Sequence, residues 1–130
     1  MTEEQKKIKI LVIDDHPFFG SNLKYKLAPH GFEVIVAESG TVGILKAKNF
    51  KPQIILVDYI MPKMDGIETI QILSKDPDLT NTYIMMYTSE AYPKVIKDSI
   101  KAGAKDFILK TAPLEKILEK LNKISEEMEK

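Results

Sequence analysis

Short runs of β-branched and other apolar residues alternate with longer amphipathic segments along the whole chain. The apolar runs predict strands at Ile8–Ile13, Glu33–Ala37, Ile54–Val57, Thr82–Tyr87 and Asp106–Leu109. The amphipathic segments that follow them predict helices at Phe18–Leu27, Thr41–Asn49, Gly66–Ser74, Pro93–Ala102 and Leu114–Met128. The expected order is therefore a strand followed by a helix, repeated five times.

The strand patterns indicate how the sheet is covered. The run Ile54-Ile55-Leu56-Val57 is apolar at every position, which is typical of a parallel strand with helices on both faces. The last predicted helix has a single apolar face with Glu and Lys between its apolar positions. Together these patterns predict an α/β fold, a five-stranded parallel sheet doubly wound by helices.

Length and composition limit the possible classes of protein. A chain of 130 residues predicts one domain over residues 1–130, with residues 1–7 as a short polar tail. The absence of cysteine excludes disulfides, zinc–thiolate sites and cysteine nucleophiles, and it favours a cytoplasmic location. No apolar segment approaches the ~20 residues that a membrane-spanning helix requires, so we expect no membrane partner.

The charges are balanced, and every cation is a lysine. Nineteen lysines face nineteen acidic residues, so no global basic field favours direct binding of nucleic acid. Because the chain has no arginine, any phosphate chemistry must rely on lysine, on backbone N–H groups or on a metal ion.

Chemistry-bearing residues follow several of the predicted strands. Asp14 and Asp15 follow the first strand, Asp58 the third, Thr88 the fourth and Lys110 the fifth. Ligands of open parallel sheets bind at the carboxyl ends of the strands, so we expect these side chains to meet at one edge. Clustered carboxylates without histidine or cysteine favour a hard cation such as Mg²⁺, which leaves coordination positions for phosphate oxygens. The pattern therefore predicts a magnesium site that receives a phosphoryl group.

These residues resemble a known family. The pair Asp14-Asp15, the segment that runs from Asp58 to Gly66, Thr88 and Lys110 are together similar to the receiver domain of two-component response regulators. The resemblance covers essentially the whole chain and implies a single receiver domain of the flavodoxin-like fold. The strand order implied is 2-1-3-4-5.

The resemblance also implies the roles of the acidic residues. Asp58 would accept a phosphoryl group from a sensor histidine kinase or a phosphotransfer protein. Asp15 and Asp58 would ligate Mg²⁺ directly, the backbone carbonyl of Ile60 would complete the protein ligands, and Asp14 would act through water. The protein would thus be a phosphoacceptor that assists its own phosphorylation and dephosphorylation, and no enzyme with a separate substrate.

A conformational switch is implied as well. Thr88 would bond a phosphoryl oxygen and Lys110 would pair with the phosphoryl group. Thr88 would then move, and the ring of Phe107 would turn inward. The downstream partner, a separate protein or an attached output domain, would bind near Ala91–Lys101 and Phe107.

The region around Pro17, Phe18 and Phe19 is the expected docking face for the kinase, because exposed aromatic side chains beside a reactive edge favour recognition.

Three positions depart from the pattern of many receivers. Phe107 replaces a common tyrosine, so no hydroxyl can hold the outward position of the ring. Thr111 follows Lys110 where many members have a cis-proline, which leaves the isomer of that peptide open. Ile60 offers no polar side chain to guide a hydrolytic water, although Glu90 could still interact with it.

Simpler readings exist for single residues. Asp14 or Asp15 could merely cap a helix, and Asp65 with Glu68 has the spacing of a capping box. Lys110 alone could be a solvated charge, and Phe107 alone a core residue. His16 and His30 have no second type of metal ligand nearby.

Three other classes of protein remain as alternatives. A phosphorylation-independent flavodoxin-like binding module would be expected to carry phosphate-binding glycines after the first strand. An aspartate-nucleophile phosphatase would usually carry a second aspartate at position 60, where this chain has Ile60. A receiver excised from a larger DNA-binding regulator also stays open, because Asp14-Asp15-His16-Pro17-Phe18 is similar to receivers joined to helix-turn-helix outputs.

Overall fold

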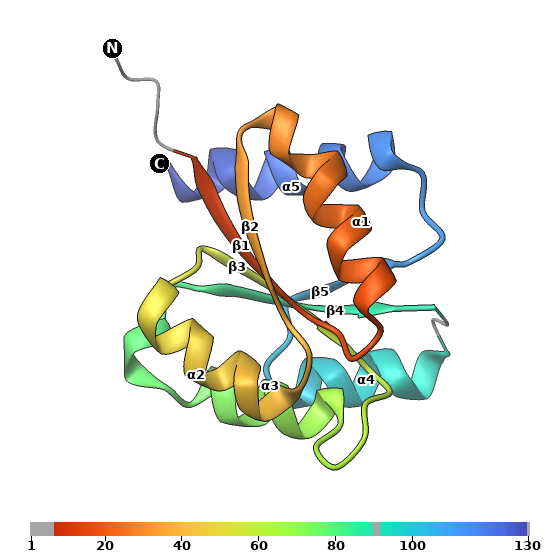
Figure 1. Cartoon of the computed structure of the whole chain (residues 1–130). Helices are drawn as coiled ribbons and strands as arrows, with labels where there is room; N and C mark the ends of the chain where they lie inside the picture. Colours follow the sequence, from red (N-terminus) through yellow and green to blue (C-terminus); the bar gives the residue numbers. More distant parts are fainter. Residues whose placement is uncertain (1–6, 90–91, 130) are drawn as a thin grey trace.

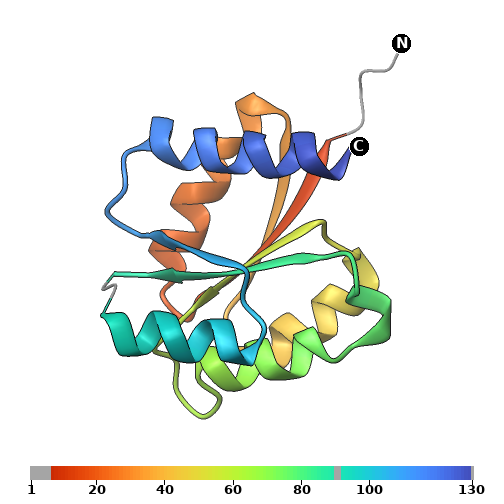
Figure 2. The same ribbon diagram turned by 180° about the vertical axis from the view of Figure 1, so that it is seen from behind.

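A computed structural model describes residues 7–89 and 92–129 of the chain. It contains a central sheet with helices on both faces, as Figures 1 and 2 show from opposite sides. The strands are β1 (Ile8–Ile13), β2 (Phe32–Ala37), β3 (Ile54–Asp58), β4 (Tyr83–Thr88) and β5 (Asp106–Leu109). The helices are α1 (Pro17–Leu27), α2 (Gly40–Phe50), α3 (Gly66–Ser74), α4 (Pro93–Ala102) and α5 (Leu114–Met128), with short 3₁₀ turns η2 (Ala28–His30) and η3 (Pro77–Leu79).

The sheet has the predicted topology. Its strand order is β2-β1-β3-β4-β5, and every neighbouring pair is parallel. This confirms the doubly wound, flavodoxin-like α/β fold. Because all strands run in one direction, their carboxyl ends lie at one edge of the sheet, on the right in Figure 1.

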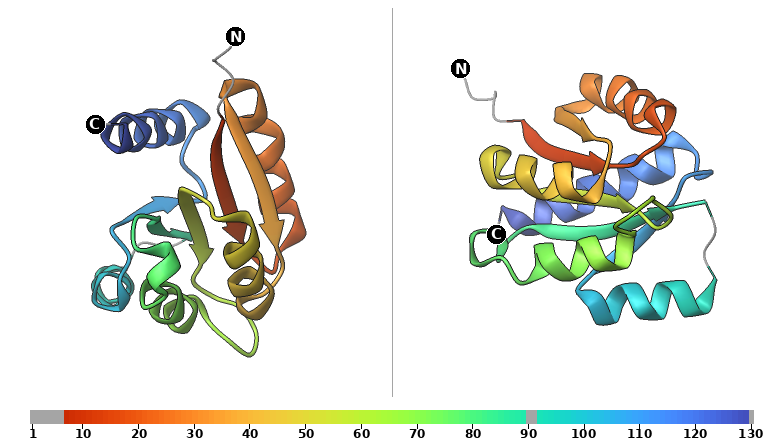
Figure 3. Two further views of the ribbon diagram at one scale, coloured as in Figure 1. Left: turned by 90° about the vertical axis from the view of Figure 1, so that its left-hand side faces the viewer. Right: turned by 60° about the horizontal axis from the view of Figure 1, so that its bottom comes forward.

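The core consists of two apolar layers, one on each face of the sheet. Helices α1 and α5 cover one face, where they contribute Leu23, Leu27, Ile117, Leu121 and Ile124. Helices α2, α3 and α4 cover the other face with Ala47, Ile70, Leu73 and Ala102. The two helical layers are visible on either side of the sheet in Figure 3. All five residues of β3 are buried, as its continuous apolar pattern predicts.

The predicted boundaries agree with the structure to within one residue. Strands β1 and β5 and helices α3, α4 and α5 match the prediction. The strands β3 and β4 each end one residue later than predicted, at Asp58 and Thr88, because the ladder continues through the pairs Asp58↔Tyr87 and Thr88↔Leu109. The 3₁₀ turns are too short to leave an apolar periodicity and were not predicted. The predicted tail lies outside the described residues, apart from Lys7.

None of the helices in the described part of the chain is long and apolar enough to cross a lipid bilayer.

Candidate functional site

Three carboxylates meet at the carboxyl edge of the sheet. Asp14 directly follows β1, Asp15 follows it in turn, and Asp58 is the last residue of β3. One oxygen of each carboxylate lies within 4.8 Å of the others. Asp14 is fully buried and Asp58 is 7% exposed, whereas Asp15 is open to solvent. The site therefore combines two buried acids with one acid that is in contact with solvent.

Lys110 is the cation that accompanies these acids. Its Nζ lies 2.7 Å from Asp14 Oδ2 and 3.2 Å from Asp58 Oδ1, and only 5% of its side chain is exposed. The backbone N–H of Lys110 donates to the carbonyl of Thr88, which fixes the residue where β5 ends beside β4. The structure thus excludes a solvated Lys110, because its ammonium is buried between two carboxylates.

The start of α3 packs directly against the strand end that carries Asp58. The N–H of Gly66 donates to the carbonyl of Tyr59, and a Cβ at Gly66 would collide with the carbonyl oxygen of Asp58. Asp65 caps this helix in a complete capping box with Glu68, as predicted. Gly66 therefore allows a close approach between helix and strand that any side chain would prevent.

The surroundings of Asp58 make its ionised form costly. Burial, and then the negative charge of Asp14, raise the pKa of Asp58 to about 6, although Lys110 acts in the opposite direction. Burial and the same two carboxylates raise the pKa of Tyr87 to about 12, so this phenol stays neutral. One ammonium does not balance three carboxylates, and the cluster favours a second cation.

A pocket of about 250 Å³ opens above Asp58. Asp15, Ile60, Thr88 and Lys110 are among its lining residues, so the pocket brings together five of the seven predicted site residues. The other two are Asp14, which is buried behind the pocket, and Phe107. Ile60 is 69% exposed at the pocket rim, and Thr88 is buried.

Phe107 lies away from the carboxylates. It is half-buried on the edge strand β5, and its ring centroid lies 5.7 Å from Lys120 Nζ on α5. It is absent from the described residues that line the pocket. Phe107 belongs to the strand whose last residue, Leu109, pairs with Thr88.

Two aromatic residues contact Lys110 and were not among the predicted site residues. Phe19 on α1 and Tyr87 on β4 place their ring centroids 4.4 and 5.5 Å from Lys110 Nζ. Phe19 was expected to be exposed with Pro17 and Phe18, but it is half-buried, whereas Phe18 is 62% exposed. The apolar pattern gives no sign of either contact, because each depends on how α1 and β4 pack around Lys110.

Asp14 does not cap a helix, and neither histidine lies in the cluster of potential metal ligands. Asp14 does accept a hydrogen bond from the backbone N–H of His16, but it is not the N-cap of α1, since that position is His16 itself. Within the described residues, the one cluster of potential metal ligands is the three aspartates, and neither His16 nor His30 joins it. The described chain contains no cis peptide bond, so the bond between Lys110 and Thr111 is trans. Glu90 lies outside the described residues.

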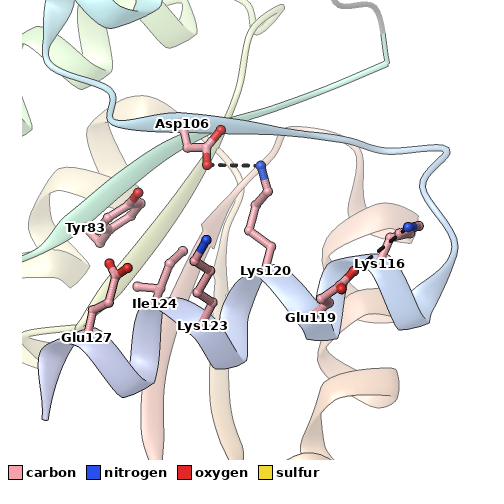
Figure 4. A pocket seen from close by; sticks show the side chains of 8 residues that line it. All are labelled: Tyr83, Asp106, Lys116, Glu119, Lys120, Lys123, Ile124 and Glu127. Atoms are coloured by element: carbon pink, nitrogen blue, oxygen red, sulfur yellow. Dashed lines mark hydrogen bonds and ion pairs between the residues drawn. The ribbon is translucent and has the colours of Figure 1, made fainter.

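A hollow with twice the volume of the pocket above Asp58 lies elsewhere on the molecule. It has a volume of about 500 Å³ and lies between α5 and the amino ends of β4 and β5 (Figure 4). Lys120 Nζ pairs with Asp106 there at 3.0 Å, and both side chains are about one-third exposed. Charges of both signs line the hollow and none of them is deeply buried, so it lacks the unbalanced charge of the aspartate site.

The three aspartates fit a hard divalent cation. All donors are carboxylate oxygens, and the exposed Asp15 leaves one side of the cluster accessible to water. Mg²⁺ prefers one or two carboxylates and retains several waters. The donor set therefore agrees with a metal site of this class.

Comparisons with known proteins agree with this geometry. The chain is 36% identical over 118 residues to the chemotaxis protein CheY of Listeria monocytogenes, covering 89% of this chain and 97% of the relative. It is 36% identical over 119 residues to the chemotaxis protein CheY of Thermotoga maritima, covering 90% and 97%. The solved structure of Vibrio cholerae chemotaxis protein CheY4 matches with a TM-score of 0.86 at 26% identity, over 91% of this chain and 98% of that one. The family profile of the response regulator receiver domain matches residues 10–122. The chain therefore belongs to the response regulator receiver family of two-component signalling and is CheY-like.

Proposed function

We propose that Asp58 accepts a phosphoryl group in the presence of Mg²⁺, and that this modification switches a protein-interaction surface. Receiver domains interact with histidine kinases and downstream targets, so the donor is a sensor histidine kinase or a phosphotransfer domain. The observation that supports the proposal most strongly is the position of Asp58. Its carboxylate lies at the base of an open pocket, 3.2 Å from a buried ammonium and beside two further carboxylates.

The transfer forms one bond and breaks another. A carboxylate oxygen of Asp58 attacks the phosphorus atom and forms a P–O bond. The bond between phosphorus and the donor breaks, and the leaving group, the imidazole of a phosphohistidine or acetate from acetyl phosphate, takes its electron pair. At neutral pH a carboxyl with a pKa of about 6 is mostly ionised and ready to attack.

Lys110 and Thr88 assist without covalent chemistry. Lys110 lies within ion-pair distance of Asp58, where it offsets the repulsion between the carboxylate and the incoming anion. Thr88 lines the same pocket and can donate its hydroxyl hydrogen to a phosphoryl oxygen. Their backbones are joined by a hydrogen bond, so both side chains are held against one point of the sheet edge.

The metal would be held by Asp15 and Asp58 directly, by the backbone carbonyl of Ile60, and by Asp14 through water. Bound there, Mg²⁺ would offset the negative charge of the carboxylates and of the phosphoryl oxygens.

The phosphoryl group would change the balance of charge at the pocket. It adds about 1.5–2 negative charges beside acids that already outnumber the single lysine. Because Thr88 pairs with Leu109 across the last two strands, a shift of Thr88 toward the phosphoryl group reaches β5, which carries Phe107. The switch follows only if the phosphoryl group makes stronger contacts in one arrangement than in the other.

The kinase would dock beside the pocket, with Phe18 as its main apolar contact. Phe18 is 62% exposed and belongs to the first turns of α1, next to Asp15. Phe18→Ala should slow phosphotransfer from a histidine kinase much more than phosphorylation by acetyl phosphate. Equal slowing with both donors would contradict this docking face.

We further propose that the chain acts in the cytoplasm as a single receiver module.

The proposal is tested by intact-protein mass measurement after incubation with acetyl phosphate, with and without Mg²⁺. We expect a gain of one phosphoryl group that requires the metal and is lost in Asp58→Asn. Asp65→Asn is the matched control, because Asp65 belongs to the capping box of α3. A gain of the same size in Asp58→Asn would refute the assignment of the acceptor.

A further inference from the structure

Two aromatic rings flank the ammonium of Lys110. The ring centroid of Phe19 lies 4.4 Å from Nζ and that of Tyr87 lies 5.5 Å from it. The carboxylates of Asp14 and Asp58 lie 2.7 and 3.2 Å from the same atom. The ammonium is thus surrounded by two anions and two rings that come from α1, β3, β4 and the residue directly after β1.

The two kinds of partner stabilise the ammonium in different ways. A carboxylate accepts a hydrogen bond and can be drawn away by a metal ion or altered by phosphorylation. A ring attracts the cation through its negative face, uses none of the N–H donors as a conventional acceptor would, and stays in place when the acids change partners. A ring can therefore keep the lysine desolvated and in position through each stage of the proposed reaction.

Phe19 is itself held in place by its neighbours. Its ring packs edge-to-face against His16 at 5.2 Å and against Phe18 at 5.6 Å, and it also lines the pocket above Asp58. Tyr87 is 3% exposed and belongs to the core, so its substitution would disturb folding as well. Of the two rings, Phe19 is therefore the one whose effect on Lys110 can be measured separately from an effect on folding.

We propose that Phe19 is a positioning residue whose ring face holds the ammonium of Lys110 beside Asp58. Its expected effect on the rate of phosphorylation rests on the function proposed above, whereas its contact with Lys110 does not. Fluorinated phenylalanines at position 19 test the contact, because each added fluorine weakens the negative ring face with little change in size.

With one, two and three fluorines, the rate of phosphorylation by acetyl phosphate should fall stepwise, to a total of about 3- to 10-fold. Acetyl phosphate is the appropriate donor because it needs no docking face. The control is the same series at Phe50, whose ring lies 5.1 Å from Lys9 Nζ and outside the pocket. The Phe50 series should leave the rate unchanged. A constant rate across the Phe19 series, or equal falls in both series, would overturn the proposal.

A second measurement does not depend on phosphorylation. A double-mutant cycle of Phe19→Leu and Lys110→Met in urea unfolding isolates the interaction between the two side chains. The loss of stability in the double variant should be smaller than the sum of the two single losses, and strictly additive losses would overturn the contact. If the wild-type protein gains no phosphoryl group, the proposed function fails, and this cycle still decides whether Phe19 holds Lys110.

Discussion

The two ends of β5 carry ion pairs of opposite character. At its start, Asp106 pairs with Lys120 of α5 at 3.0 Å, and both side chains are about one-third exposed beside a hollow of about 500 Å³. At its end, Lys110 contacts Asp14 and Asp58 and is 5% exposed, beside a hollow of half that volume. Only the three residues between Asp106 and Lys110 separate a balanced surface pair from an unbalanced buried cluster.

This difference indicates which of the two places carries the function. An exposed ion pair contributes about 0–1 kcal/mol, and its charges are already satisfied by each other and by water. In the buried cluster, carboxyl groups outnumber the single lysine, and a cation or a phosphoryl group changes the energy of every member. Burial and charge imbalance therefore identify the site better than the size of a pocket does.

The largest expected difference concerns the two lysines. Lys110→Met leaves Asp14 and Asp58 buried without their cation, and we expect it to lower the free energy of unfolding by about 3–5 kcal/mol. Lys120→Met removes the partially exposed partner of Asp106 and should cost at most about 1 kcal/mol. Urea unfolding at pH 7 in the presence of a chelator measures both. Similar losses in the two variants would show that the ends of β5 do not differ as described.

The second prediction concerns the stability cost of ionising Asp58. Its pKa is about 6 in the folded protein against the ordinary value of 3.8, so between these values the folded state binds more protons than the unfolded state. The free energy of unfolding of metal-free protein should therefore decrease as the pH rises from about 4 to about 6. Asp58→Asn has no charge to bury and should be more stable at pH 7 by up to about 3 kcal/mol.

The advantage of Asp58→Asn should disappear near pH 4, where the wild-type carboxyl is protonated as well. Chemical unfolding of both proteins across this pH range gives the comparison. Asp106→Asn, at the exposed end of β5, is the matched control and should show no such gain. A variant at position 58 that is less stable than the wild type at pH 7 would contradict the cause assigned to the raised pKa.

The third prediction has the smallest effect. Mg²⁺ at ten times its dissociation constant should stabilise the wild-type protein by about 1.4 kcal/mol, because only the folded state assembles the three carboxylates. Asp15→Asn should reduce this stabilisation, and Asp106→Asn should retain it. Thermal unfolding with and without Mg²⁺ measures the change. An equal response in the two variants would place the metal elsewhere.

Most of the fold could be predicted because the apolar pattern is strong where strands are buried on both faces. It placed β1 and β5 at their observed limits. It ended β3 and β4 one residue early, because the last paired residues, Asp58 and Thr88, are polar. An apolar pattern cannot indicate a strand that continues into a functional edge.

The residues that meet at this edge of the sheet could be predicted better than the burial and the contacts of each of them. The rule that parallel strands end at one edge brought Asp14, Asp58 and Lys110 together. It gave no reason why Asp14 is fully buried while the adjacent Asp15 is exposed. It also could not place Phe19 against Lys110, because that contact depends on how α1 packs across the sheet edge.

The central claim is that the buried carboxylate of Asp58, and no other acid of the cluster, receives the phosphoryl group. The most direct test is to treat the protein with acetyl phosphate and Mg²⁺, reduce the acyl phosphate with borohydride, and locate the modified residue by peptide mass mapping. Hydride reduction converts an aspartyl phosphate to homoserine with loss of phosphate. The account predicts homoserine at position 58 alone. Homoserine at position 14 or 15, or at none of the three, would contradict it.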